Sequence, residues 1–163
     1  MLKKIIVAGH GKWCEESLKL LKKKYIISNV IGRYKTEDIS LKNFFIKNNI
    51  KYLRYKNINN NKNIKEILSY DPDLIISISY DQIFKKIFLK LFNSIINFHA
   101  GNLPSYRGRS VVNWAIINGE KFLGLTVHKI DSKIDTGDII LKRMINISKY
   151  DNYNSILNKI YEK

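Results

Sequence analysis

Short apolar runs alternate with amphipathic stretches along the first hundred residues of this 163-residue chain. The alternation predicts βαβ units, and hence a Rossmann-like, doubly wound α/β fold with a mostly parallel sheet. The run at 74–78 is continuous and β-branched, which is typical of a strand buried on both faces of a parallel sheet. Ser40 is a suitable N-cap for the second helix. The predicted strands are residues 4–8, 25–31, 50–53, 74–78 and 94–98, and the predicted helices are residues 15–23, 41–48, 64–70 and 82–92, with a polar loop at 57–63.

The pattern changes after residue 122. Residues 123–130 and 138–145 read as two strands with no helix between them, so we expect a C-terminal β-hairpin. A final amphipathic stretch occupies residues 153–163. We therefore expect one domain over residues 1–145 and the start of a C-terminal element over residues 146–163. Either a C-terminal portion is missing or the chain is an unusually short member of its class.

The composition narrows the class of protein. The net charge of +15 would attract an anionic partner, but the cations are mostly Lys spread along the chain, which favours a solvated Lys-rich surface over a nucleic-acid face. No apolar run approaches the ~20 residues needed to span a bilayer, and the single cysteine, Cys14, excludes an intrachain disulfide. These features predict a cytoplasmic protein without a membrane partner.

One glycine-rich turn suggests an alternative function. Gly9-His10-Gly11 follows the first predicted strand and precedes a helix, as in a dinucleotide-binding turn. Cys14 stands where that motif has its third glycine, and no acidic residue closes the second strand. A nucleotide-binding Rossmann oxidoreductase therefore stays a competing hypothesis, as does a binding module without catalytic activity.

The segment from residue 95 to residue 140 carries the candidate chemistry. Asn97 and His99 are two apart near the end of a predicted strand, so their side chains point to the same side. An amide can donate to a developing oxyanion, an imidazole can move the proton of an attacking amine, and a carboxylate from a later loop could support the imidazole. A histidine near a strand end is more often structural, so spacing alone leaves this role open. We interpret His128, in the strand at 123–130, as structural.

The order of motifs resembles the formyltransferase family that includes glycinamide ribonucleotide, methionyl-tRNA and amino-sugar formyltransferases. That family reads Asn-x-His, Leu-Pro, Arg-Gly, Gly-Glu or Gly-Asp, Gly-x-Thr and Asp-x-Gly in this order. Each motif is present here, in turn at Asn97, Leu103, Arg107, Gly119, Gly124 and Asp135. The resemblance implies a formyltransferase catalytic domain over residues 1–145. It also implies 10-formyltetrahydrofolate as co-substrate and no metal.

The resemblance also implies roles for individual residues. Asn97 would stabilise the oxyanion and His99 would be the general acid/base, while Asp135 would favour the protonated imidazole and help to relay protons. Family members usually carry Ser two residues after the catalytic His, where this chain has Gly101. The residues implied around the folate are Asp131, Ser132, Lys133 and Ile134 in a loop at the pterin, Gln82, Ile83 and Phe84 through backbone groups, Leu103 and Pro104 as pocket walls, and Arg109.

The acceptor implied by the resemblance is a primary amine. Residues 106–109, 113–114 and 118–120 are similar to the sugar-modifying branch, which favours the amine of an anionic nucleotide-linked amino sugar. Methionyl-tRNA is the alternative acceptor, and its main support is the high positive charge. A homodimer is a further expectation from the family.

Overall fold

The computed structural model describes residues 2–92 and 94–162. Its strands are ordered β3-β2-β1-β4-β5-β6-β7 in one sheet, and the chain divides into two compact units, residues 1–96 and residues 97–163. The mostly parallel α/β sheet with a C-terminal antiparallel pair confirms the predicted fold class. Among the described residues, no helix combines the length and the apolar character needed to cross a bilayer.

The first unit is built on four parallel strands. β1 pairs with β2 and with β4, and β2 pairs with β3. Ile6 and Val7 of β1 are fully buried, as expected for a central strand covered on both faces. Each strand matches a predicted run to within one or two residues: β1 is Lys4–Gly9, β2 is Ile26–Gly32, β3 is Lys51–Arg54 and β4 is Leu74–Ile78.

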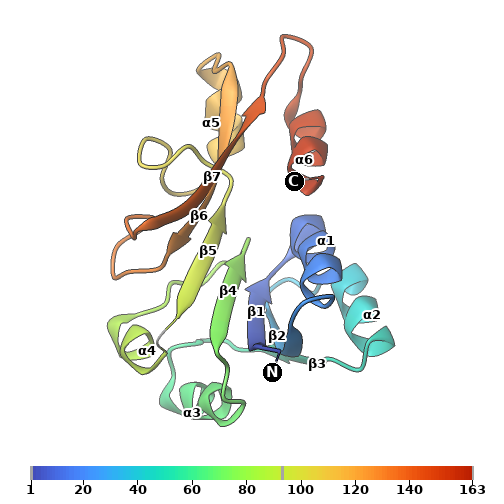
Figure 1. Ribbon diagram of the computed structural model, residues 1–163, viewed down its shortest axis with the longest axis vertical. Coiled ribbons are helices and arrows are strands. Elements are labelled where there is room, and N and C mark those ends of the chain that lie inside the picture. The colour runs from blue at the N-terminus through green and yellow to red at the C-terminus, as the bar shows by residue number, and fades with distance from the viewer. Residues whose placement is uncertain (1, 93, 163) are drawn as a thin grey trace. The chain divides into compact units, whose positions relative to one another are not determined.

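Three helices connect these four strands and a fourth, α4, follows β4; α1 and α2 lie on one flank of the strands, and α3 and α4 lie on the other (Figure 1). The prediction that Ser40 caps the second helix is wrong. Asp38 caps α2 by accepting a hydrogen bond from the Leu41 backbone N–H at 3.1 Å, whereas the Ser40 hydroxyl donates to Glu15. The helices are α1 (Gly11–Leu21), α2 (Ile39–Lys47), α3 (Asn61–Ser69) and α4 (Lys86–Leu91).

The boundaries of α3 and α4 differ from the prediction because side-chain amides compete for the backbone. Asn60 accepts from the Lys62 N–H and starts α3 inside the predicted polar loop. Before α4, Asn59 donates to the Ile83 carbonyl and accepts from the Lys85 N–H. These two bonds hold residues 83–85 outside the helix, so α4 begins at Lys86 rather than at Gln82.

The second unit begins within β5 (Ile95–His99) and contains the hairpin of β6 (Phe122–Lys129) and β7 (Ile139–Asn146). The two hairpin strands pair antiparallel, as predicted. The helix α5 (Val111–Ile117) was not predicted, because it is short, rich in β-branched residues and without a side-chain cap at Ser110. It buries Val111, Val112 and Ala115. The last helix is α6 (Tyr153–Tyr161), and its buried residues are Ile156 and Ile160.

Candidate active site

The last three residues of β5 place two polar side chains in the second unit. Asn97 and His99 alternate with Phe98, so both project from the same side of the strand. The residue His99 is only 7% exposed, and buried imidazoles require hydrogen-bonding partners. The interactions of these two side chains define the site.

One nitrogen of His99 is fixed by the backbone. Its Nε2 lies 2.6 Å from the carbonyl oxygen of Tyr106. Because a carbonyl only accepts hydrogen bonds, Nε2 carries a proton and donates it. Nδ1 then faces Asp135, whose Oδ2 lies 3.6 Å away. Nδ1 is therefore the nitrogen at which a proton can be gained or lost beside a carboxylate.

Asp135 is held as a carboxylate by several groups. The Gly108 backbone N–H donates to Oδ2 at 2.8 Å, and Nε2 of His128 lies 3.4 Å from Oδ1. Burial alone would raise the pKa of Asp135, but these two partners and the nearby His99 outweigh burial and lower it. The Asp135 side chain is therefore ionised at neutral pH and can stabilise a positive charge on His99.

His128, which the sequence analysis interprets as structural, also contacts this cluster. Its Nδ1 donates to the Lys129 carbonyl at 2.7 Å, so Nε2 is the nitrogen that faces the site. Nε2 lies 3.2 Å from Nδ2 of Asn97. Burial disfavours a charged His128, yet hydrogen bonding to Asp135 and to the Lys129 carbonyl raises its pKa above 6.5. Neutral His128 accepts from Asn97, and protonated His128 donates to Asp135.

The sequence contained a signal for His128. Thr126 and His128 are two apart on β6 and both are buried, so polar side chains occupy the covered face of this strand. Thr126 Oγ1 donates to the Gly101 carbonyl at 2.7 Å and fastens the segment that follows β5. Polar residues at alternate positions of an otherwise apolar strand could have identified this face.

Gly101, where the resembled family usually has Ser, is required by close packing in this chain. A Cβ atom at this position would lie 2.3 Å from Nε2 of His99 and 2.4 Å from the Tyr106 carbonyl oxygen. Glycine therefore leaves room for the hydrogen bond that orients His99.

The loop before Asp135 is organised by Asp131. The Asp131 carboxylate accepts from the Thr136 hydroxyl at 2.7 Å and from the Lys133 N–H at 3.0 Å, and the Thr136 bond is the main cause of its lowered pKa. Asp135 itself has a φ of 51°, in the left-handed region. Among the other folate residues predicted in this unit, Leu103 is buried, and the exposed ones are Pro104, Arg109, Ser132, Lys133 and Ile134.

The predicted folate residues of the first unit have other contacts. The Gln82 amide donates to the Tyr55 carbonyl at 2.7 Å and accepts from the Ile58 N–H at 2.8 Å. Phe84 is buried and packs against Phe88, while Ile83 is exposed. The side chains of Gln82 and Phe84 are thus occupied inside this unit, so a folate contact here would use backbone groups, and it stays a prediction.

The glycine-rich turn of the competing hypothesis is occupied by a carboxylate. Asp38 Oδ2 accepts from the Gly11 N–H at 2.8 Å at the start of α1 and lies 3.8 Å from His10 Nδ1. A Cβ on Gly9 would clash with Cys14, so this glycine serves helix packing. An anion already present at this helix N-terminus disfavours binding of a pyrophosphate there.

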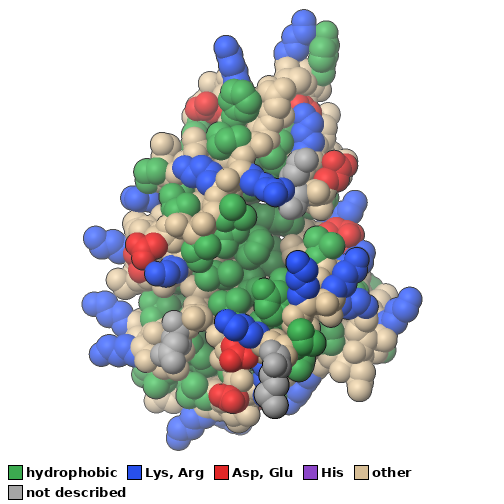
Figure 2. Space-filling view, viewed as in Figure 1, with side chains coloured by type: hydrophobic (Ala, Val, Ile, Leu, Met, Phe, Trp, Pro, Cys, Tyr) green, Lys and Arg blue, Asp and Glu red, His purple; other side chains and the backbone are tan. Residues whose placement is uncertain are grey.

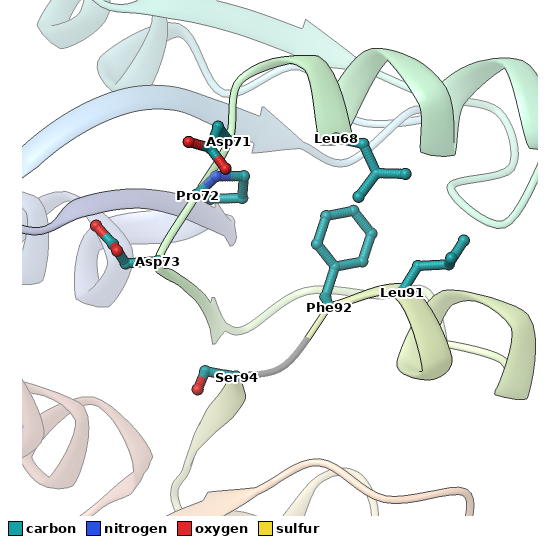
Figure 3. A pocket seen from close by; sticks show the side chains of 7 residues that line it. All are labelled: Leu68, Asp71, Pro72, Asp73, Leu91, Phe92 and Ser94. Carbon is teal, nitrogen blue, oxygen red and sulfur yellow. The ribbon is translucent and has the colours of Figure 1, made fainter.

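A pocket of about 320 Å³ lies elsewhere in the first unit (Figure 3). One of its lining residues, Asp73, directly precedes β4, so the pocket lies at the amino end of that strand. Ligand sites of α/β sheets lie at the carboxyl ends of strands. The pocket contains no predicted site residue and is lined by Leu68, Asp71, Pro72, Asp73, Leu91, Phe92 and Ser94. Among residues 2–92 and 94–162, no group of three His, Cys, Asp or Glu side chains could hold a metal ion.

Comparison with known proteins identifies relatives along almost the whole chain. The methionyl-tRNA formyltransferase of Clostridium tetani is 36% identical over 169 residues, covering 98% of this chain and 54% of the relative. The chain thus spans about half the length of the curated relatives that it matches.

Solved structures show the same fold. Glycinamide ribonucleotide transformylase 1 from Symbiobacterium toebii superimposes with a TM-score of 0.85 at 21% identity, covering 99% of this chain and 81% of that chain. The sugar 3N-formyl transferase WlaRD, solved in the presence of dTDP and 5-N-formyl-THF, has a TM-score of 0.77 at 27% identity. That match covers 99% of this chain and 58% of WlaRD.

Members of this group use formyl-tetrahydrofolate as co-substrate. The family model described as "Formyl transferase" matches residues 3–163. Because that match extends over both compact units, the chain belongs to the formyl transferase family.

Proposed function

We propose that this chain carries the reaction centre of an N-formyltransferase that moves a formyl group from 10-formyltetrahydrofolate to a primary amine. The supporting observation is the cluster in which the buried His99 and His128 both face the half-buried Asp135 carboxylate and Asn97 contacts His128. An oxidoreductase has less support, because Asp38 already occupies the glycine-rich turn that a dinucleotide would need.

The side chains suit attack of an amine on a formyl carbon. A bond forms between the amine nitrogen and the formyl carbon, and the bond from that carbon to the folate nitrogen breaks. The amide of Asn97 has two N–H groups, and His128 uses one of them, so the second can donate to the oxyanion. The amine loses one proton and the folate nitrogen gains one.

In this proposal His99 moves that proton. Its Nε2–H stays with the Tyr106 carbonyl, so Nδ1 accepts the proton of the amine and Asp135 stabilises the resulting imidazolium. Passing the same proton to the leaving folate nitrogen returns His99 to its starting state. Each of the three groups implied by the family motif therefore has one defined task.

Two acceptors are candidates, and the relatives favour methionyl-tRNA. The first curated relatives carry that name, and a net charge of +15 would assist binding of a polyanion. On the face drawn in Figure 2, Lys and Arg side chains are scattered rather than gathered in one patch, so the charge would attract a polyanion without marking a binding site for it. The nucleotide-linked amino sugar is the second candidate, and its support is the sugar 3N-formyl transferase WlaRD.

Mass spectrometry of the acceptor tests this proposal. The chain is incubated with 10-formyltetrahydrofolate and either methionyl-tRNA or nucleotide-linked amino sugars, and each product is examined for the gain of one formyl group. We expect transfer with the parent and none with His99→Ala. Transfer that weakens steeply with salt would favour the tRNA. An active His99→Ala variant would refute the assigned chemistry.

A further inference from the structure

One loop holds both members of the proposed acid–base pair. We call residues 106–108 the clamp. The Tyr106 carbonyl accepts from His99 Nε2 at 2.6 Å, and two residues later the Gly108 N–H donates to Asp135 Oδ2 at 2.8 Å. Both contacts are made by backbone atoms, so the position of the clamp sets the orientation of the imidazole and of the carboxylate together.

The clamp lies in irregular structure and needs an anchor. Gly108 has a φ of 87°, and the segment lies between β5 and α5 without a strand or helix of its own. The Tyr106 N–H donates to the Asn102 carbonyl at a long 3.2 Å. Loops held by so few backbone bonds move more readily than helices and strands.

The side chain of Tyr106 supplies that anchor. Its hydroxyl donates to Glu120 Oε1 at 2.7 Å and accepts from Asn118 Nδ2 at 3.0 Å. A hydrogen bond to a charged acceptor is stronger than one between neutral groups. The ring is rigid, so fixing the hydroxyl restricts the backbone of the same residue, whose carbonyl binds His99.

The two residues that bind the Tyr106 hydroxyl, Asn118 and Glu120, lie at the ordered end of α5. The Glu120 N–H donates to the Ala115 carbonyl at 2.9 Å, and Gly119, with a φ of 65°, ends the helix in the left-handed conformation. The helix is fixed in turn by burial of Val111 and Ala115. A continuous series of contacts therefore runs from packed side chains through Glu120 and Tyr106 to His99.

We propose that Tyr106 and Glu120 are positioning residues, which hold the clamp so that His99 and Asp135 keep their mutual geometry. The proposal rests on the proposed function, because it assigns the two residues to support of the same reaction. Neither residue needs to touch a substrate. It gives a physical role to Gly119-Glu120, a family motif that the proposed acid–base chemistry does not itself use.

The first test follows the His99 Nε2 proton by nuclear magnetic resonance of ¹⁵N-histidine-labelled protein. A proton held 2.6 Å from a carbonyl oxygen should give a downfield signal that exchanges slowly with water. We expect Tyr106→Phe and Glu120→Ala to broaden or shift this signal and to speed its exchange. Glu120→Gln keeps an acceptor oxygen and should restore most of the parent signal.

The controls separate positioning from general stability. Tyr150→Phe removes a hydroxyl from a tyrosine that is 83% exposed, and Asp138→Asn removes an acid whose side chain is 82% exposed. Both should leave the His99 signal unchanged. Tyr106→Phe combined with Glu120→Ala should be no worse than the stronger single variant, because Tyr106→Phe already removes the Tyr106–Glu120 hydrogen bond that Glu120→Ala removes.

Kinetics give the second readout. A displacement of about 1 Å at a reacting group can cost about 100-fold in rate, so we expect kcat to fall about 5- to 30-fold with KM for the folate within about twofold. An unchanged His99 proton in Tyr106→Phe would overturn the proposal, even if the melting temperature fell. The proton signal needs no turnover, so an inactive parent would refute the proposed function while leaving the clamp testable.

Discussion

Replacing Asp135 by asparagine tests the charge at the site with little change of shape. Asparagine can still accept from the Gly108 N–H through its oxygen, so the loop should persist. For unit charges 3.6 Å apart at an effective dielectric constant of about 20, Coulomb's law gives on the order of 4–5 kcal/mol. Because desolvation offsets part of this and the amide dipole keeps a fraction, we expect a loss of about 3–4 kcal/mol of transition-state stabilisation. That corresponds to roughly a 10²- to 10³-fold fall in kcat/KM.

Single-turnover formyl transfer, quantified by mass spectrometry of the acceptor, measures this loss. Asp138→Asn is the matched control, because Asp138 is exposed and pairs with Lys129 at the surface. The control should retain the parent rate. If Asp135→Asn kept more than about a third of the parent kcat/KM, the charge of Asp135 would not contribute to catalysis and the reasoning would be refuted.

Three further predictions concern the same cluster. Gly101→Ala places a Cβ 2.3 Å from His99 Nε2, so kcat should fall at least about tenfold and stability by about 1–3 kcal/mol; parent-like kinetics and thermal melting would contradict this. His128→Leu removes a partner of Asn97 and Asp135, so the free energy of unfolding measured in urea should fall by about 1–3 kcal/mol. An unchanged urea midpoint would contradict this prediction. The third prediction concerns pH. The lowered pKa of Asp135 gives stability that is present above pH 3.8 and lost as pH falls through its folded-state value, whereas the raised pKa of His128 gives stability that is complete below pH 6.5 and lost as pH rises through its folded-state value. The difference in unfolding free energy between the parent and Asp135→Asn should therefore peak between about pH 4 and pH 6.5, and a difference independent of pH would count against the pairing.

The sequence predicted the elements whose signals are local. The apolar runs located every strand, and the period-two spacing of Asn97 and His99 correctly placed both on one side of β5. The start of α4 was missed because Asn59, more than 20 residues away in the chain, binds the backbone before it. Helix α5 was missed because its β-branched sequence has weak helix propensity and is stabilised by burial.

The same distinction between local signals and contacts distant in the chain applies to the candidate site. The cluster of His99 with Asp135 agrees with the motif order, whereas the place of His128 depends on how β6 lies beside these residues in the folded unit. The role of Tyr106 was also beyond local patterns, because it is exercised by a backbone carbonyl, a group that every residue has. Backbone contributions to a site become visible only when the chain conformation is known.

The left-handed backbone of Asp135 has a consequence for mutational scanning of this protein. At a φ of 51° most L-residues are strained, whereas Gly, Asn and Asp are tolerated. Saturation mutagenesis at codon 135 should therefore separate two selection pressures. Selection for folded protein alone should enrich Asp, Asn and Gly, and selection for turnover should retain Asp alone, so the two enrichment profiles together reveal how much of the site's intolerance comes from conformation and how much from chemistry.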